Sequence, residues 1–469
     1  MTIFIDASIV VNFPIGSVQG VESLSEMGTA IYKFKGIPYA EAPVGQLRLK
    51  DPVAVKPWGA VREAVADPKA CPQLNGSKKV DDSEDCLYLN VYTPSIKPKN
   101  LKPVMIWIHG SSSYYPTPSF NTGEASEDSY NPELLLDEEI VFVSVQYRLG
   151  LLGFLSLPGN DEISGNYGLK DQKQAMRWVK DNIAYFGGDP SRVTIFGQST
   201  GAVSVHAHVL AEDEENLFQA AIAQSGTALT SFGHDVHSSS LDAVAAIGCH
   251  NEEYSSSDVL RCLQSASVES LLEQPFAAWP VDDRTSKSPI MPFDPLQQLK
   301  DAKMKKIPLL VGINSDDAGS LAYDNVQQTA PSLMKFVYKH RPVKLATDAW
   351  FGMPAYHTLV QHGKHAPVYS YILAEPCGAS EASSSYARVT HGEDLSCIFS
   401  RQDRTGGQAM VRSWTNFAKY HQPSPSWDTV SAWHFAKGGQ IGIFGDIEMA
   451  GEGVEDILER IELWNKLEE

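Results

Sequence analysis

The chain has 469 residues, of which 43% are hydrophobic and 20% charged, proportions typical of a soluble globular protein with a large core. Its formal net charge of −19 argues against a nucleic acid or an anionic membrane surface as a partner, and no apolar run is long enough to span a bilayer. Two or three average domains would fit this length, but α/β enzymes often use it for one sheet with large insertions. We therefore expect one domain over residues 1–469.

The N-terminus and the cysteines both bear on the cellular compartment. Residues 1–6 contain no basic leader, and Asp6 interrupts the apolar run before a signal-peptide core can form, so we expect a cytoplasmic protein. The cysteines are too sparse for a disulfide scaffold and lack metal-site spacing, which favours reduced, mostly buried thiols. They occupy positions 71, 86, 249, 262, 377 and 397.

Strand-like and helix-like segments alternate along the chain. A hairpin is predicted over residues 18–32, and apolar residues at helical spacing predict a helix over 171–183. Residues 238–270 and 324–363 are expected to form helices that roof a pocket, and residues 454–466 a final amphipathic helix. The other predicted strands cover residues 87–92, 104–108, 140–147, 193–196, 220–224, 308–312 and 368–373. This alternation predicts an α/β fold, with a mainly parallel sheet between helices.

Residues 193–201 have the sequence Val-Thr-Ile-Phe-Gly-Gln-Ser-Thr-Gly and precede the apolar, helix-compatible residues 202–210. A strand that runs through Gly-x-Ser-x-Gly into a helix is the pattern of a nucleophile elbow, a tight turn that exposes the serine hydroxyl. Gly197 and Gly201 leave room for the neighbouring strand and helix. Ser199 is therefore the predicted nucleophile.

Seven further segments, in order over nearly the whole chain, match motifs of one enzyme family. They are Phe34–Ala40, Ser83–Tyr92, Gln146–Gly153, Asn166–Gln172, Phe186–Thr194, Gln224–Gly226 and Trp414–Ala418. Together with the elbow, they resemble the type-B carboxylesterase and cholinesterase family of α/β-hydrolases. The resemblance implies an α/β-hydrolase fold with helical insertions over the active-site gorge, and it says little about the substrate.

A serine nucleophile needs a base that takes its proton and an acid that orients the base. In α/β-hydrolases these groups follow in the order serine, acid, histidine. His391 lies in Val-Thr-His-Gly-Glu-Asp, which resembles the family's His-Gly-x-Glu loop, and is the predicted base. The acid is predicted at Asp317, where the family has a glutamate, with Asp316 as the alternative. The shorter side chain requires the acid loop or His391 to lie closer.

The resemblance also implies which residues surround the triad. The family's oxyanion hole corresponds to the backbone N–H groups of Ser111, Ser112 and Thr200, although two of its glycines are serines here. Either the loop keeps its conformation despite the serines, or their hydroxyls donate directly or bind a polar part of the substrate. Gln198, which replaces a common glutamate, and Ser225 are expected to make hydrogen bonds next to the triad.

Aromatic residues indicate the character of the pocket. Tyr114, Tyr115 and Phe120 follow the oxyanion strand and are expected to line the gorge. The segment between residues 71 and 86 lacks the tryptophan that would bind a quaternary ammonium, so choline esters are not expected. The interval between acid and histidine is short for the family, which suggests a trimmed lid and a more open gorge.

The resemblance bears on the cysteines as well. Cys71 with Cys86, and Cys249 with Cys262, occupy positions that look like two of the family's disulfides, whereas the last two cysteines match none. Either the chain folds in an oxidising compartment, by a route not evident at its N-terminus, or these pairs stay reduced.

The leading hypothesis is a serine hydrolase that cleaves a carboxylic ester or lactone of a bulky, fairly apolar substrate through an acyl-enzyme. An alcohol in place of water would make it a transesterase. This chemistry requires no metal and no cofactor. A cyclase or lyase of the same fold, acting on a secondary metabolite, is the alternative suggested by the altered oxyanion loop. A catalytically inactive binding module is a third hypothesis, but such relatives usually lack the serine or histidine. The oligomeric state is not indicated.

Overall fold

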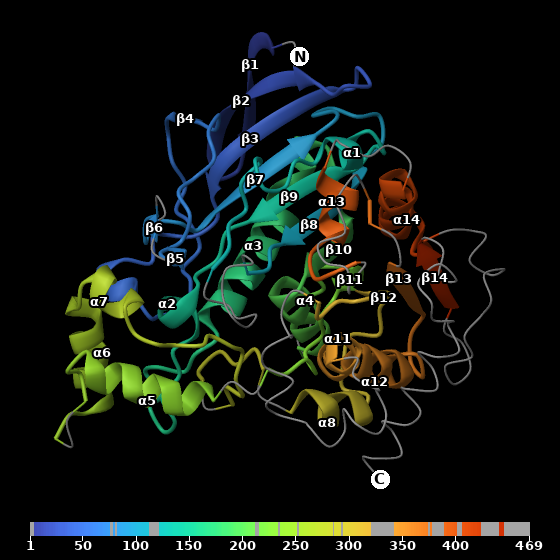
Figure 1. Ribbon diagram of the computed structural model, residues 1–469. Helices are drawn as coiled ribbons and strands as arrows, with labels where there is room; N and C mark the ends of the chain where they lie inside the picture. The colour runs from blue at the N-terminus through green and yellow to red at the C-terminus, as the bar shows by residue number, and fades with distance from the viewer. Residues whose placement is uncertain are drawn as a thin grey trace. The chain divides into compact units, whose positions relative to one another are not determined.

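The computed structural model forms two compact units (Figure 1). The first comprises residues 1–195, 210–219 and 233–297, and the second residues 196–209, 220–232 and 298–469. The predicted final helix over 454–466 lies outside the described residues, and the single domain stays a prediction. The structure describes residues 4–75, 78–79, 82–111, 122–211, 215–232, 235–250, 253–284, 286–291, 294–319, 342–373, 376–377, 389–400, 406–423 and 440–444.

The first unit contains a sheet with the strand order β1-β2-β3-β7-β9-β8-β10. Neighbours pair antiparallel from β1 to β9, whereas β8 pairs with β9 in parallel. The predicted hairpin over residues 18–32 is confirmed as β2 and β3, while β1 was not predicted. The strands are β1 (Phe4–Phe13), β2 (Gly16–Leu24), β3 (Ala30–Pro38), β7 (Tyr88–Thr93), β8 (Lys102–Ile108), β9 (Val141–Val145) and β10 (Gly188–Gln198). Three short strands complete the set, namely β4 (Val61–Glu63), β5 (Leu74–Asn75) and β6 (Lys78–Lys79).

The longest helix of the first unit is α3 (Tyr167–Asn182), which begins four residues before the helix predicted from periodicity. Its start is set by Asn166, which has a φ of 55° and whose side-chain amide exchanges hydrogen bonds with the backbone of Val281. That partner lies far along the chain, so local periodicity could not reveal the start. The other helices are η1 (Gly45–Leu47), α1 (Glu133–Leu136), α2 (Gly150–Phe154), η2 (Ile183–Phe186), α5 (Val236–Ala246), α6 (Ser256–Ser265) and α7 (Val268–Leu272).

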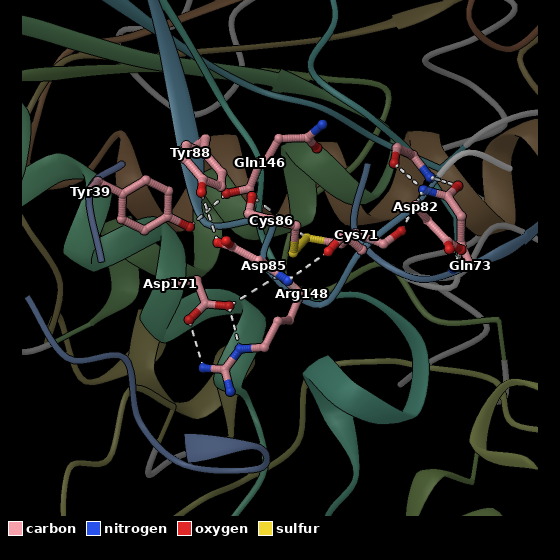
Figure 2. Close-up of a disulfide and its surroundings, with 12 residues drawn as sticks. Tyr39, Cys71, Gln73, Asp82, Asp85, Cys86, Tyr88, Gln146, Arg148 and Asp171 are labelled. Carbon is pink, nitrogen blue, oxygen red and sulfur yellow. Dashed lines mark hydrogen bonds and ion pairs between the residues drawn. A yellow bond between two sulfur atoms is a disulfide. The ribbon is translucent and has the colours of Figure 1, made fainter. Parts of the chain in front are cut away.

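All six cysteines form disulfides. The pairs are Cys71–Cys86, Cys249–Cys262 and Cys377–Cys397, with Cα–Cα distances of 5.1, 5.5 and 5.0 Å. Figure 2 shows the first pair near the buried ion pair of Arg148 and Asp171, in which two guanidinium nitrogens each lie 2.7 Å from a carboxylate oxygen.

The expectation of reduced thiols in a cytoplasmic protein is therefore wrong. Disulfides form and persist in oxidising environments, so three of them point to a secretory or extracellular protein. The expectation failed because cysteine spacing does not reveal which pairs folding brings together. The pair Cys377–Cys397, which matched no family disulfide, joins the segment after β13 to the helix α13.

The second unit contains the carboxyl end of β10 and four further strands, in the order β10-β11-β12-β13-β14. The strands from β11 to β14 pair in parallel. They are β11 (Ala220–Gln224), β12 (Leu309–Asn314), β13 (Val368–Leu373) and β14 (Gln440–Phe444). The predicted strands over 220–224 and 368–373 are confirmed with the same bounds, whereas β14 was not predicted.

Helices pack on both faces of β13. Successive residues of a strand point to opposite faces, so neighbouring residues of β13 contact different helices. Tyr369 and Tyr371 make edge-on ring contacts with Phe417 and Trp414 of α14. Val368, of opposite parity, lies against Gly363, which follows α12. Figure 1 labels β13, α12 and α14. The helices are α4 (Thr200–Leu210), α8 (Pro295–Lys300), α11 (Pro342–Thr347), the π-helix η3 (Asp348–Gly352), α12 (Met353–His362), α13 (Asp394–Phe399) and α14 (Gly406–Tyr420). This arrangement confirms the α/β architecture.

Candidate active site

Ser199 is the single residue between the end of β10 and the start of α4. Its φ of 59° is a strained conformation for a residue with a side chain, with a cost of roughly 1–3 kcal/mol. The Ser199 N–H donates to the Gln224 carbonyl at 2.9 Å, and the Ser199 carbonyl accepts from the Val203 N–H at 3.0 Å. Gly226 lies so close that a Cβ there would be 2.7 Å from the Ser199 carbonyl oxygen. This is the strand-turn-helix geometry of a nucleophile elbow.

Asp317 follows β12 in the turn after that strand, and it is fully buried, with 0% of its surface exposed. Its Oδ1 lies 2.6 Å from His391 Nδ1, and its Oδ2 accepts a hydrogen bond from the Asn314 N–H at 2.9 Å. Because a carboxylate only accepts, Nδ1 of His391 carries the proton in this contact. The neutral ring then has an unprotonated Nε2, which is the form that a general base needs.

Asp316 has a different partner from Asp317. Its Oδ1 lies 2.8 Å from Lys344 Nζ, which also donates to the Ser315 carbonyl at 2.9 Å. The structure thus pairs Asp317 with His391, and Asp316 with Lys344.

His391 lies in a turn just before α13, and its side chain is 11% exposed. Its ring stacks on Phe351, with ring centroids 4.9 Å apart and planes at 25°. The Gln198 Nε2 lies 3.3 Å from His391 Nε2, to which the amide donates in the tautomer described above. The basic nitrogen therefore lies beside the residue that immediately precedes Ser199.

A buried hydrogen-bond network links the loops that carry Asp317 and His391. Gln224 donates to Asp394 Oδ2 at 2.7 Å and accepts from the Trp414 indole N–H at 3.0 Å. Asn314 donates to the Thr390 carbonyl at 2.7 Å. Burial raises the pKa of Asp394 to about 6; the negative charge of Asp317 adds to this rise, and the hydrogen bond from Gln224 opposes it.

Sequence reasoning did not assign this network. A signal was available, because Gln224 and Asn314 are polar residues at the carboxyl ends of two otherwise apolar, neighbouring strands. In parallel sheets such ends meet at one edge, where sites are commonly built.

Further aromatic rings pack beyond Phe351, the side chain that stacks on His391. Phe232 contacts Phe351 and Trp350 with centroid distances of 6.0 and 5.3 Å. Sequence reasoning placed the aromatic lining elsewhere and missed this cluster. Phe351 and Trp350 lie in the π-helix η3, an uncommon element that often occurs at functional sites.

The family sequence pattern described as "Carboxylesterase family" matches residues 7–337 and 336–440 of this chain. The chain belongs to the carboxylesterase family. It is 32% identical to juvenile hormone esterase of Tribolium castaneum, in a match that covers 87% of this chain and 83% of that protein. Pyrethroid hydrolase Ces2e of Rattus norvegicus is 30% identical, in a match that covers 89% of this chain and 83% of that protein. Neuroligin-2 of Mus musculus is also 30% identical, in a match that covers 88% of this chain and 60% of that protein.

These findings confirm the resemblance and the α/β-hydrolase fold, and they make this carboxylesterase a carboxylic-ester hydrolase. Within the described residues, no helix is both long and apolar enough to cross a membrane. The described side chains also include no group of three or more histidines, cysteines or acids that could hold a metal.

The other predicted site residues of this carboxylesterase have different outcomes. Thr200 is the first residue of α4 and is buried, and Ser225 has a φ of 51° with its N–H donating to the Gly312 carbonyl at 2.8 Å. Among the described residues, neither side-chain hydroxyl has a hydrogen-bond partner. Ser111 is described as part of the first unit, and its oxyanion role stays a prediction. Four predicted residues lie outside the described part of the chain, namely Ser112, Tyr114, Tyr115 and Phe120.

Buried histidines also lie outside the Asp317 contact in this carboxylesterase. His206 and His208 of α4 and His109 after β8 are all buried. Burial lowers the pKa of His109 to about 4 and that of His206 to about 3, so both rings are neutral near pH 7. The Ala228 N–H donates to His206 Nδ1 at 3.0 Å.

Proposed function

We propose that this carboxylesterase cleaves its ester through an acyl-enzyme on Ser199, with His391 as general base and Asp317 as the acid that orients it. The observation that carries the proposal is the 2.6 Å contact between His391 Nδ1 and Asp317 Oδ1. With its proton on Nδ1, the neutral His391 ring has an unprotonated Nε2, 3.3 Å from the side-chain amide of Gln198, which precedes the elbow serine. The burial of Asp317 supports the role, because a carboxylate shielded from water stabilises the imidazolium more strongly.

The reaction then follows from these positions. Ser199 Oγ attacks the ester carbonyl carbon while His391 Nε2 takes the hydroxyl proton. The resulting oxyanion accepts a hydrogen bond from the Thr200 N–H, one of the groups that a helix start leaves without an intrahelical acceptor. The imidazolium gives its proton to the leaving alcohol, and the acyl group stays on Ser199. Water then attacks the acyl carbon while His391 takes its proton, and the imidazolium returns a proton to Ser199 Oγ as the carboxylic acid is released. An alcohol in place of water would give a new ester.

The aromatic cluster beside the base supports a bulky, fairly apolar substrate. Phe351 contacts the His391 ring, and Phe232 and Trp350 extend the apolar surface from there. An apolar group bound there would remove hydrocarbon surface from water on both partners, at about 25 cal/mol for each square ångström buried. We expect this gain to favour longer acyl or alcohol groups over acetate or methanol.

Labelling with a fluorophosphonate tests the proposed nucleophile. The probe forms a phosphonyl-serine only where a base activates the hydroxyl, so intact mass should rise by one adduct in the wild type and not in Ser199→Ala. Ser265→Ala, a change at an exposed serine of α6, is the matched control and should keep the adduct. Hydrolysis of p-nitrophenyl butyrate, followed on the same samples, should be lost only in Ser199→Ala. Full turnover by Ser199→Ala would refute the proposed mechanism.

A further inference from the structure

We propose that one helical segment, residues 342–352 of α11 and η3, positions the acid and the base of the triad relative to each other. Lys344 and Thr347 act on the acid loop, and Phe351 acts on the base ring. The inference rests on the proposed function, since it assigns positioning residues to the proposed triad. It concerns residues that sequence reasoning left without a role.

The acid loop is held on both sides of Asp317. Lys344 Nζ lies 2.8 Å from Asp316 Oδ1 and donates to the Ser315 carbonyl at 2.9 Å, so it holds the two residues before Asp317. Thr347 Oγ1 accepts from the Ala318 N–H at 3.0 Å and holds the residue after it. None of these contacts occupies the Asp317 carboxylate, which stays available for His391 and Asn314.

The contacts come from one side of the segment. Residues three or four apart in a helix lie on the same face, so Lys344 and Thr347 present their side chains together. Phe351, four residues after Thr347, continues this spacing into η3, where it stacks on His391 at 4.9 Å. One helical segment thus contacts both the loop that carries Asp317 and the ring of His391.

The ion pair between Lys344 and Asp316 is shielded from water, with side-chain exposures of 14% and 7%. A shielded pair is screened little by salt and fixes its partners more tightly than a surface pair does. Thr347 is buried as well. The acid loop is therefore held by groups that cannot readily exchange these contacts for water.

This support has a particular use in a triad built on aspartate, whose side chain is one methylene shorter than that of glutamate. The backbone of the acid loop must lie close to His391 for the 2.6 Å contact to form. The segment 342–352 contacts both the acid loop and the His391 ring and can maintain this separation.

Kinetics on variants at the two polar contacts test the inference. Lys344→Met and Thr347→Val remove the polar contacts while keeping much of the side-chain bulk. We expect each to lower kcat for p-nitrophenyl butyrate by roughly 10-fold to 100-fold, with KM little changed, because a slightly misplaced catalytic group slows the chemistry. Thr347→Ser keeps the hydroxyl and should restore kcat. Lys364→Met, at a lysine after α12 that pairs with Gln361, is the control.

A second readout separates positioning from folding and from the proposed function. Fluorophosphonate titration counts active sites, so a merely structural effect would reduce the count and leave kcat per site unchanged. The far-downfield proton of the bond between His391 and Asp317, observed by proton NMR, should shift or broaden in Lys344→Met and Thr347→Val. If wild-type turnover does not depend on Ser199, the proposed function fails, while the NMR comparison still tests the segment. Wild-type kcat per site and an unmoved proton signal in both variants would overturn the inference.

Discussion

Replacement of the buried Asp394 by asparagine should change how the stability of the protein depends on pH. Asp394 is fully buried, and burial followed by the charge of Asp317 raises its pKa from 3.8 to about 6. The folded state therefore binds more protons than the unfolded state between about pH 4 and about pH 6. Stability from this group is present below its unfolded pKa and is lost as pH rises through about 6.

The size of the effect follows from the same values. The rise from 3.8 to about 6, at 1.36 kcal/mol for each pKa unit, corresponds to about 3 kcal/mol. Ionised Asp394 should therefore cost the wild type about 3 kcal/mol at neutral pH. The asparagine side chain of the variant is uncharged at every pH and keeps one oxygen that can accept from Gln224, as Asp394 does at 2.7 Å.

We expect Asp394→Asn to gain stability relative to the wild type as pH rises, by up to about 3 kcal/mol between about pH 4 and about pH 7. Urea unfolding curves at several pH values, with disulfides intact, measure this difference. Asp242→Asn, at an exposed aspartate of α5, should show no such trend. A difference between wild type and Asp394→Asn that stays constant or falls with pH would refute the reasoning.

Three further predictions concern the surroundings of the proposed triad. Gln198→Glu places a negative charge 3.3 Å from His391 Nε2, and the acid limb of the pH profile of kcat/KM should move up by roughly one unit. An unmoved limb would argue against the contact. Conversion of Cys377 and Cys397 to serine opens a loop of 20 residues that contains His391. This change should lower the free energy of unfolding by about 3 kcal/mol and reduce kcat. Conversion of Cys249 and Cys262 to serine should leave kcat unchanged. Phe351→Ala should lower the free energy of unfolding, measured by thermal unfolding, by about 3 kcal/mol. It should also lower kcat/KM more for p-nitrophenyl butyrate than for p-nitrophenyl acetate. Equal losses for the two esters would contradict an apolar substrate surface at Phe351.

The elements whose signals are local could be predicted from the sequence. The elbow at Ser199 was evident because a strand, a Gly-x-Ser-x-Gly turn and a helix follow one another within a few residues. The apolar strands β11 and β13 were predicted with their observed bounds for the same reason. His391 was predicted as the base from a short motif in its own loop. Strand alternation and turn chemistry act over short spans, and these features depend on little else.

The features that join distant segments were decided by the tertiary structure. Asp316 and Asp317 are neighbours of the same chemistry, and the fold distinguishes them by placing Lys344 at one and His391 at the other. The pairing of Cys377 with Cys397, and with it the compartment, could not be read from spacing for the same reason. Hydrogen bonds and ion pairs form over a few ångströms in space, so their partners depend on strand order and helix packing, which no local pattern contains.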